Sequence, residues 1–241
     1  MEIRGRRECQ DCGTRWSYYE TGSVACPECG SVHSTGLDDE RTLHTASPGE
    51  LDLTPGGTAV DDLTPRELAR EAKDEARPFV RRHGFVRGGA LQPLDDTYLT
   101  AVELTYVADA ADRALELDDR EHAYLLELLG GADEGERPPP AEVPPPFHAA
   151  RGLAVADAVE AYRREVRKWL EANPHPEVRD VLARVHDHER RVQALDGDID
   201  PDSAERLLSA VREVGTYLID GDDGALESAR ARLDRLDDAP A

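Results

Sequence analysis

All four cysteines of this 241-residue chain lie within its first 29 residues. They form two CxxC pairs, made by Cys9, Cys12, Cys26 and Cys29. Thirteen residues separate the pairs, and a glycine follows each second cysteine, at Gly13 and Gly30. This spacing is typical of a metal site with four thiolate ligands, most often structural zinc. The pairs therefore predict one bound Zn²⁺ and a small fold built around it.

The coordination chemistry of zinc explains the pattern. A CxxC turn directs two thiolates at one ion, and two such turns complete a tetrahedron. Glycine after the second cysteine allows a positive φ, so that amide groups can face the sulfur atoms. Such a short segment buries too little surface to fold alone, so metal binding would supply its stability. Four thiolates close the site, which favours a structural ion, and His33 and His44 are expected to be spectators.

The segment CQDCGTRWSYYETGSVACPECGS resembles zinc ribbons of the transcription factor IIB type, and CPECG resembles a ribbon knuckle. The whole chain resembles an uncharacterised haloarchaeal family with such a ribbon at its front. The resemblance implies structural zinc on the four cysteines. It also implies contact of the ribbon with polymerase subunits, nucleic acid or other protein partners. The remainder departs from the transcription factor, because its acidic helices show no cyclin-like repeats.

The same segment also resembles the rubredoxin-like module of rubrerythrins, in which aromatic residues follow a CxxCG and a CPxC closes the site. That resemblance implies iron and electron transfer. Rubrerythrins also need a di-iron helical bundle built from Glu-x-x-His pairs. None of the eight histidines here has a glutamate three positions before it, and Asp119-x-x-His122 comes nearest. Iron remains the alternative to zinc.

Acidic residues outnumber basic ones by 51 to 29, which gives a net charge of −22. Residues 1–36 carry a net charge of −1, so almost all of the excess lies in residues 37–241. Apolar residues recur at helical spacing, which indicates a folded protein with an acidic surface suited to high salt. No apolar run approaches the roughly 20 residues of a membrane span, and MEIRGRRE lacks the apolar core of a signal peptide. We expect a cytoplasmic protein with no membrane partner.

Composition divides the chain into five parts, and the expected fold class is mainly α. We expect a β zinc ribbon over 1–36, a linker over 37–61, a helical region over 62–130, a Pro-rich linker over 131–148, and an antiparallel bundle of three or four helices over 149–238. The ERPPPAEVPPP stretch in the second linker cannot continue a helix. It favours an extended polyproline spacer between two separate helical parts.

In the helical region, Thr64-Pro65-Arg66-Glu67 predicts a helix start with a capping box. Pro78 is expected to kink or end this helix. A second helix over about 95–117 should turn four acidic residues towards water: Glu103, Asp109, Asp112 and Glu116. A third helix should cover about 119–129.

The C-terminal part carries apolar residues at alternating spacings of four and three. The first stripe is Val155, Val159, Tyr162, Val166 and Trp169. Similar stripes follow the Asn173-Pro174-His175-Pro176 turn and the Asp200-Pro201 start signal, which predicts helices packed through one face. His188 falls on the second stripe and should be partly buried and hydrogen-bonded. Arg163-Arg164 should form local ion pairs on a helix surface.

Arginine and aromatic residues lie close together in the ribbon. The candidate contacts for nucleic acid or a partner are Arg4, Arg6, Arg7, Arg15, Trp16 and Tyr18. Such residues can bind phosphate and stack on bases; alternatively, Trp16 packs on the ribbon and the arginines offset nearby acids. The chain has no phosphate loop, catalytic triad or dinucleotide motif. We expect a non-enzymatic interaction or regulatory protein. The ribbon would be its recognition element and the helices its scaffold, and the expected partner is a protein.

Overall fold

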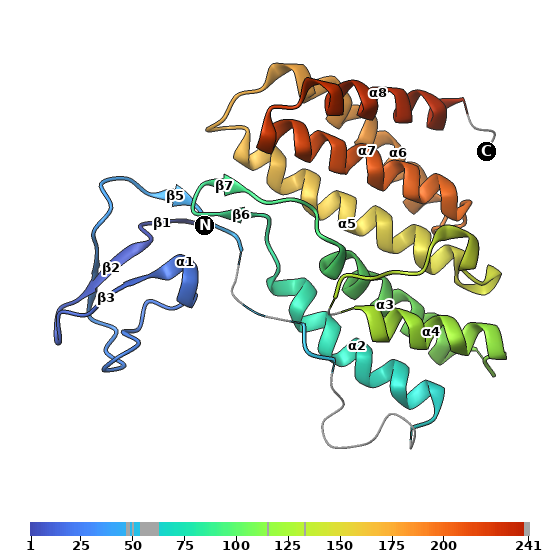
Figure 1. Ribbon diagram of the computed structural model, residues 1–241, viewed down its shortest axis with the longest axis horizontal. Coiled ribbons are helices and arrows are strands. Elements are labelled where there is room, and N and C mark those ends of the chain that lie inside the picture. Colours follow the sequence, from blue (N-terminus) through green and yellow to red (C-terminus); the bar gives the residue numbers. More distant parts are fainter. Residues whose placement is uncertain (47–48, 50, 54–62, 115, 133, 239–241) are drawn as a thin grey trace.

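The computed structural model describes residues 1–46, 49, 51–53, 63–114, 116–132 and 134–238. The protein is mainly α-helical with a small antiparallel β region at its N-terminus, which confirms the expected fold class (Figure 1). Within the described part of the chain, no helix combines the length and the apolar character that a membrane span requires.

Residues 1–36, here called the cysteine module, are organised by a three-stranded antiparallel sheet. Its strands are β2 (Arg6–Cys9), β3 (Arg15–Ser17) and β4 (Ser34–Gly36), in the order β3-β2-β4. A single helical turn, α1 (Tyr18–Thr21), follows β3. The central strand β2 ends at Cys9, so the sheet holds the first of the four cysteines at a defined position.

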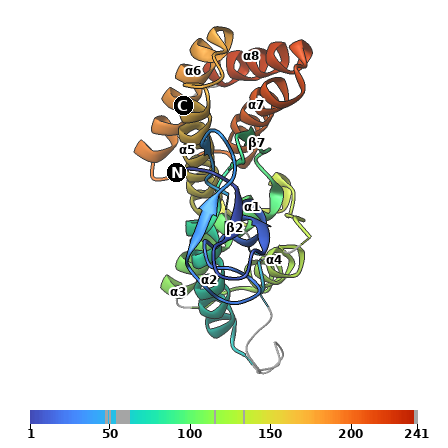
Figure 2. The same cartoon turned by 90° about the vertical axis from the view of Figure 1, so that its left-hand side faces the viewer.

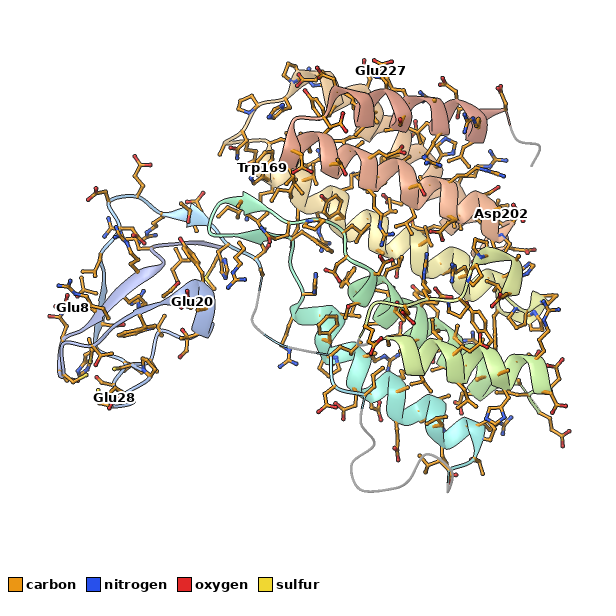
Figure 3. The ribbon with its side chains drawn as sticks, viewed as in Figure 1. Glu8, Glu20, Glu28, Trp169, Asp202 and Glu227 are labelled. Atoms are coloured by element: carbon orange, nitrogen blue, oxygen red, sulfur yellow. The ribbon has the colours of Figure 1, made fainter. Side chains whose placement is uncertain are left out.

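Two short strand pairs join the cysteine module to the helices. One is β1 (Glu2–Ile3) with β5 (Thr42–Leu43), and the other is β6 (Val86–Arg87) with β7 (Ala90–Leu91). The Gly89 amide donates to the Leu43 carbonyl at 2.8 Å, and the Trp169 indole donates to the Gly89 carbonyl at 2.8 Å. Trp169 therefore anchors the junction to the helical body, and it lies at the end of its helix that faces β7 (Figure 3).

His44 lies inside this junction, which we call the ladder junction. The Gly88 amide donates to its Nδ1 at 3.1 Å, and its ring packs against Tyr18 and Tyr19. A Cβ added at Gly5 would lie 2.1 Å from the Tyr19 ring, so this position requires glycine. The expected linker over 37–61 is thus structured in its first part, and its remaining residues lie mostly outside the described ones.

Seven longer helices follow in the described part of the chain. They are α2 (Pro65–Arg82), α3 (Asp96–Arg113), α4 (Asp119–Gly131), α5 (His148–Trp169), α6 (Arg179–Ala194), α7 (Pro201–Asp220) and α8 (Asp223–Asp237). Helix α2 packs on α3, α3 on α5, α5 on α6 and α7, and α7 on α8. The result is a stack of helices, and the cysteine module projects from one edge of it (Figures 1 and 2).

The helical region and the C-terminal bundle share one hydrophobic core, whereas the sequence suggested two parts separated by a spacer. The cluster of buried residues runs without interruption from α2 through α8. Helix α3 is the reason, because residues Tyr98 to Leu104 are all buried and the helix packs on both α2 and α5. A helix that is buried on several sides belongs in the centre of a body, not at its edge.

The Pro-rich stretch packs on this core instead of extending as a polyproline spacer. It contains two 3₁₀ turns, η2 (Pro140–Glu142) and η3 (Pro145–Phe147). Val143 and Phe147 are buried against the helices. Their burial offsets the entropy of ordering the segment, and an exposed polyproline segment would lack that contribution.

The local start signal of α2 is confirmed. Thr64 and Glu67 form the predicted capping box, and Pro65 occupies the first helical turn. Helix α2 nevertheless continues past Pro78 to Arg82. The buried residues on either side, Ala76 and Phe79, hold the last turn in place although Pro78 donates no hydrogen bond.

Glu103 corrects the sequence-based expectation, because it is fully buried instead of facing water. Arg151 Nη1 donates to both of its carboxylate oxygens at 2.9 Å, and Arg137 Nη1 donates to one of them at 3.2 Å. Arg137 and Arg151 also bind Glu205, at 2.6 and 3.2 Å. Tyr124 donates to Glu103 as well. We call these five residues the buried ion cluster; they connect α3, α4, α5, α7 and the loop before η2.

Arg163 is a second correction. It is 6 % exposed and forms a two-bond ion pair with Glu189 on α6, at 2.9 and 3.2 Å, instead of a local pair on the helix surface. Each of these buried charges finds its partner on a different helix. The pairs therefore specify which helices lie side by side, a role that buried ion pairs can fill even where they add little stability. His188, by contrast, is half-buried and contacts Asp237 at 3.1 Å, as expected for the apolar stripe.

Candidate metal centre

The two CxxC turns have the same local structure. In each turn, the amide of the glycine donates to the carbonyl of the first cysteine: Gly13 to Cys9 at 3.1 Å and Gly30 to Cys26 at 2.9 Å. Both glycines have positive φ, 77° and 72°. The sequence predicts this conformation from the position of the glycines, and the matching bonds show that the two turns are equivalent halves of one site.

The four cysteine sulfur atoms lie within 4.8 Å of one another. Two of the sulfur–sulfur distances, Cys9 to Cys29 and Cys12 to Cys26, are 3.6 Å. Ligands around a tetrahedral ion with bonds of about 2.3 Å lie about 3.8 Å apart, so the sulfur atoms fit one tetrahedral metal ion. Cys9 and Cys26 are buried while Cys12 and Cys29 are exposed. Two of the cysteines are thus fixed in the interior of the module, and the other two are accessible to a metal ion from solvent.

The pKa values of the Cys12 and Cys29 thiols are shifted in opposite directions. Hydrogen bonds with the Thr14 hydroxyl and backbone lower the pKa of Cys12 to about 6. At Cys29 a backbone hydrogen bond from Ser31 lowers the pKa, but the neighbouring sulfur atoms of Cys12 and Cys9 outweigh it and raise the pKa to about 12. The contacts between sulfur atoms keep the proton on Cys29, because two adjacent thiolates would repel each other, whereas the bonds with Thr14 favour the thiolate of Cys12. A divalent cation removes that repulsion, because it binds all four sulfurs as thiolates.

The aromatic residues named as candidate contacts, Trp16 and Tyr18, are both buried. Trp16 is buried between Cys9 and Cys26, and its indole donates to the Ser23 carbonyl at 3.1 Å. Tyr18 is also buried and contacts the ring of His44. Neither ring presents an open face on which a base could stack.

The arginines named as candidate contacts have partners within the chain. Arg6 pairs with Asp38 at 2.5 Å, and Arg15 pairs with Glu8 at 2.6 Å. Arg7 donates to the hydroxyl and carbonyl of Ser34 on β4, and Arg4 donates to the Asp39 carbonyl at 3.4 Å. Arg6 and Arg15 remain largely exposed, at 74 % and 72 %. Their charges are thus accessible but already balanced.

The histidines near the site lie outside the sulfur cage. His33 is exposed beside Asp11, and His44 is inside the ladder junction. Among the described residues, the four cysteines are the one group of cysteine, histidine and acidic side chains close enough to hold an ion. In the His186-Asp187-His188-Glu189 segment, the side chains diverge: His188 faces Asp237, while Glu189 binds Arg163.

Sequence reasoning missed the buried ion cluster, although one signal was available. Glu103 is the only charged residue in the run Tyr98–Ala108, which is otherwise apolar or hydroxylic. A charge within such a run requires a buried partner, because an unpaired carboxylate in the core is very costly. The identity of that partner could not be read from the sequence, since Arg151 lies 48 positions away.

The fold and the site define a mainly α-helical protein with an N-terminal cluster of four cysteines whose geometry fits one metal ion. The chain belongs to a family of unknown function, DUF7117, whose model matches residues 1–233. No curated protein and no solved structure matches the chain.

Proposed function

We propose that this protein is a zinc-binding, non-enzymatic interaction protein. The cysteine module would be a zinc ribbon that recognises a partner, and the acidic helical body would be its scaffold. The observation that carries the proposal is the cage of four sulfur atoms built by two equivalent turns. Four thiolates fill the coordination sphere of zinc, which suits an ion that shapes a surface instead of one that binds substrate.

Exposed apolar residues support recognition by the cysteine module. Val24 and Val32 in the module are 42 % and 67 % exposed, and Leu37, directly after it, is 39 % exposed. The Ser34 hydroxyl donates to the Val24 carbonyl at 2.9 Å, which brings the segments around these residues together. Exposed valines and leucine beside a rigid metal turn favour a protein partner over nucleic acid. Arg6 and Arg15 already form ion pairs within the chain, which also favours a protein partner over nucleic acid.

The first experiment tests the metal. Protein isolated without added metal should contain one zinc per chain, and it should be colourless. Chelation, or the Cys26→Ser substitution, should abolish amide protection in residues 1–36, while α5 and α7 keep theirs in hydrogen exchange. A red, iron-loaded protein with a reversible redox couple would support the rubredoxin-like alternative. Protein without metal, whose N-terminal segment is equally ordered after chelation, would contradict the proposal.

The second experiment tests recognition. A partner captured from native cells should be lost with Val32→Glu and kept with Leu126→Glu, since Leu126 is an exposed apolar residue on α4, outside the cysteine module. If the partner is nucleic acid, binding should instead weaken in an Arg6→Ala/Arg7→Ala variant and fall steeply with added salt. Turnover that is lost on a substitution in the helical body would overturn the non-enzymatic assignment.

The charge of the chain supports a proposal about its environment. A net charge of −22 produces self-repulsion that concentrated salt screens, because the Debye length is only about 3 Å at 1 M salt. We propose that the protein works in a high-salt cytoplasm, as in haloarchaea.

A further inference from the structure

A hollow between α5 and α6 departs from the acidic character of the protein. It has a volume of about 610 Å³ and is closed at one end by the turn that contains η4 (Pro176–Val178). Five of its lining residues are basic or histidine: Arg163, Arg167, His175, Arg179 and His186. No acidic residue lines it in the described part of the chain, although acids outnumber basic residues by 51 to 29 overall.

The charges on the two walls differ in their availability. Arg163, at the back, is neutralised by Glu189. Arg167 on α5 and Arg179 on α6 are both exposed, and among the described residues no carboxylate lies within ion-pair distance of either one. Arg184, also on α6, behaves differently, because it binds both Asp234 and Asp237. Two guanidinium groups of the lining, one from each helix, are therefore available to bind a ligand.

The histidines of the hollow are held in place by neighbouring groups. His175 stacks on Trp169 with a centroid distance of 6.1 Å and an interplanar angle of 12°, and its Nδ1 contacts Glu177 at 2.9 Å. His186 is 41 % exposed, and its buried Nδ1 forms no hydrogen bond, although Glu189 lies 3.5 Å away. Because this nitrogen is buried beside Glu189, it faces the interior, and the exposed part of the His186 ring contributes to the wall of the hollow.

The positive region continues beyond the hollow. A second depression of about 580 Å³ adjoins it across Arg163 and Arg167, and it is also lined by Arg164 and Lys168. Glu160 and Glu171 border that second depression, so its charge is partly balanced. The first hollow is therefore the more strongly positive of the two.

The remaining lining of the first hollow is apolar. Leu170, Leu182 and Ala183 contribute aliphatic surface, and Pro174 and Pro176 form the rim. Small-molecule sites commonly measure about 300–1,000 Å³ and combine an apolar lining with a few polar groups. A guanidinium group binds phosphate through two parallel hydrogen bonds, and arginine keeps its charge at any physiological pH.

We infer that the hollow between α5 and α6 is a binding site for a small organic phosphate. Arg167 and Arg179 would hold the phosphate from opposite walls, and Leu170 and Leu182 would contact the body of the ligand. This inference does not depend on the metal centre. It adds a ligand-binding function to the helical body, which the proposed function treats as a scaffold.

Isothermal titration calorimetry of the metal-loaded full chain tests the inference. The probes are ADP, ribose 5-phosphate, inorganic phosphate and adenosine, each at low and at high salt. ADP and ribose 5-phosphate distinguish a nucleotide from a sugar phosphate as the natural class. Both phosphate esters should bind more tightly than inorganic phosphate, and adenosine should not bind. Added salt should weaken binding, because the walls attract the phosphate electrostatically.

Three glutamine variants separate a built site from general surface charge. Arg167→Gln and Arg179→Gln should each reduce the affinity for the tightest probe at least tenfold. Arg190→Gln should leave it unchanged, because Arg190 is exposed on α6 but does not line the hollow. All three positions are exposed, so unchanged melting temperatures should confirm that the variants fold. Absence of binding at 1 mM, equal effects of all three variants, or binding of a single-stranded oligonucleotide but of no mononucleotide would overturn the inference.

Discussion

At the scale of single residues, Glu103 shows how burial decides the role of a charge. Its carboxylate receives hydrogen bonds from Arg137, Arg151 and Tyr124 in the interior. Burial lowers the pKa of Arg151, but the charge and hydrogen bonds of Glu103, together with Tyr124 and Glu205, raise it by more in total. Two arginines and two carboxylates balance the charge of the cluster inside the core.

Glu103→Gln should therefore destabilise the protein strongly. The substitution leaves Arg137 and Arg151 buried with only Glu205 to balance them, and removing one partner of a buried pair costs about 3–5 kcal/mol. Asp112→Asn is the matched control, since Asp112 also lies on α3 but pairs with Arg70 at the surface. Its effect should stay below about 1 kcal/mol. Urea unfolding at pH 7 measures both values, and equal effects would contradict the structural role of the cluster.

His44 should make stability depend on pH. Burial, followed by the positive charges of the N-terminus and Arg87, lowers the pKa of His44 in the folded state. Below about pH 6.5 the unfolded chain binds a proton that the folded ladder junction resists, so stability is full above this pH and is lost as pH falls. A proton on Nδ1 also prevents this atom from accepting the hydrogen bond of the Gly88 amide.

The test of this prediction compares unfolding free energies at pH 7.5 and pH 5.5. His44→Asn keeps an acceptor near the Gly88 amide but cannot be protonated, so its stability should fall less than that of the unmodified chain. His188 also has a pKa lowered by burial and adds to the slope in both proteins. Identical slopes in the two proteins would show that His44 does not carry the effect.

At the scale of elements, helix starts and metal turns could be predicted because their signals are local. The capping box at Thr64 and the positive φ of Gly13 and Gly30 depend on neighbours within a few positions. The continuation of α2 past Pro78 and the folding of the Pro-rich stretch onto the core were not predictable in the same way. Both depend on surface buried against distant helices, which outweighs local propensity.

Gly30→Ala should weaken metal binding with little effect on the helical body. The φ of 72° costs an alanine about 1–2 kcal/mol, which corresponds to a loss of about five- to thirtyfold in metal affinity. Gly221→Ala is the control, because Gly221 has a φ of 73° and equally open surroundings but ends α7. It should lower global stability without changing metal affinity. Competition with a chromophoric chelator measures affinity, and a metal affinity unaffected by Gly30→Ala would contradict the role of the turn.

At the scale of the whole molecule, charge and packing act in opposite directions. The continuous core joins α2 to α8, while the net charge of −22 makes the acidic side chains repel one another. The ladder junction then attaches the cysteine module through β1, β5, β6 and β7 (Figure 1). Each of its strands has only two residues, so its stability depends on His44, Tyr19 and Trp169 as well as on the backbone.

Salt should therefore stabilise the protein. The melting temperature should rise as KCl increases from 0.05 M to 2 M, because screening reduces repulsion among the acidic side chains. Sucrose solutions of low ionic strength provide the control for effects that do not depend on charge. A melting temperature that does not change with salt would contradict the argument from the acidic surface.

The sequence by itself determined the group of four cysteines, the glycine turns, the helix starts and the mainly α composition. Each of these follows from residues that lie close together in the chain, so the relevant chemistry can be read locally. Only the tertiary structure decided that the two helical parts form one body, that Glu103 and Arg163 are buried, and that Arg167 and Arg179 line the same hollow. These features require contacts between distant segments, and which contacts form depends on how the apolar surface of the whole chain is buried at once.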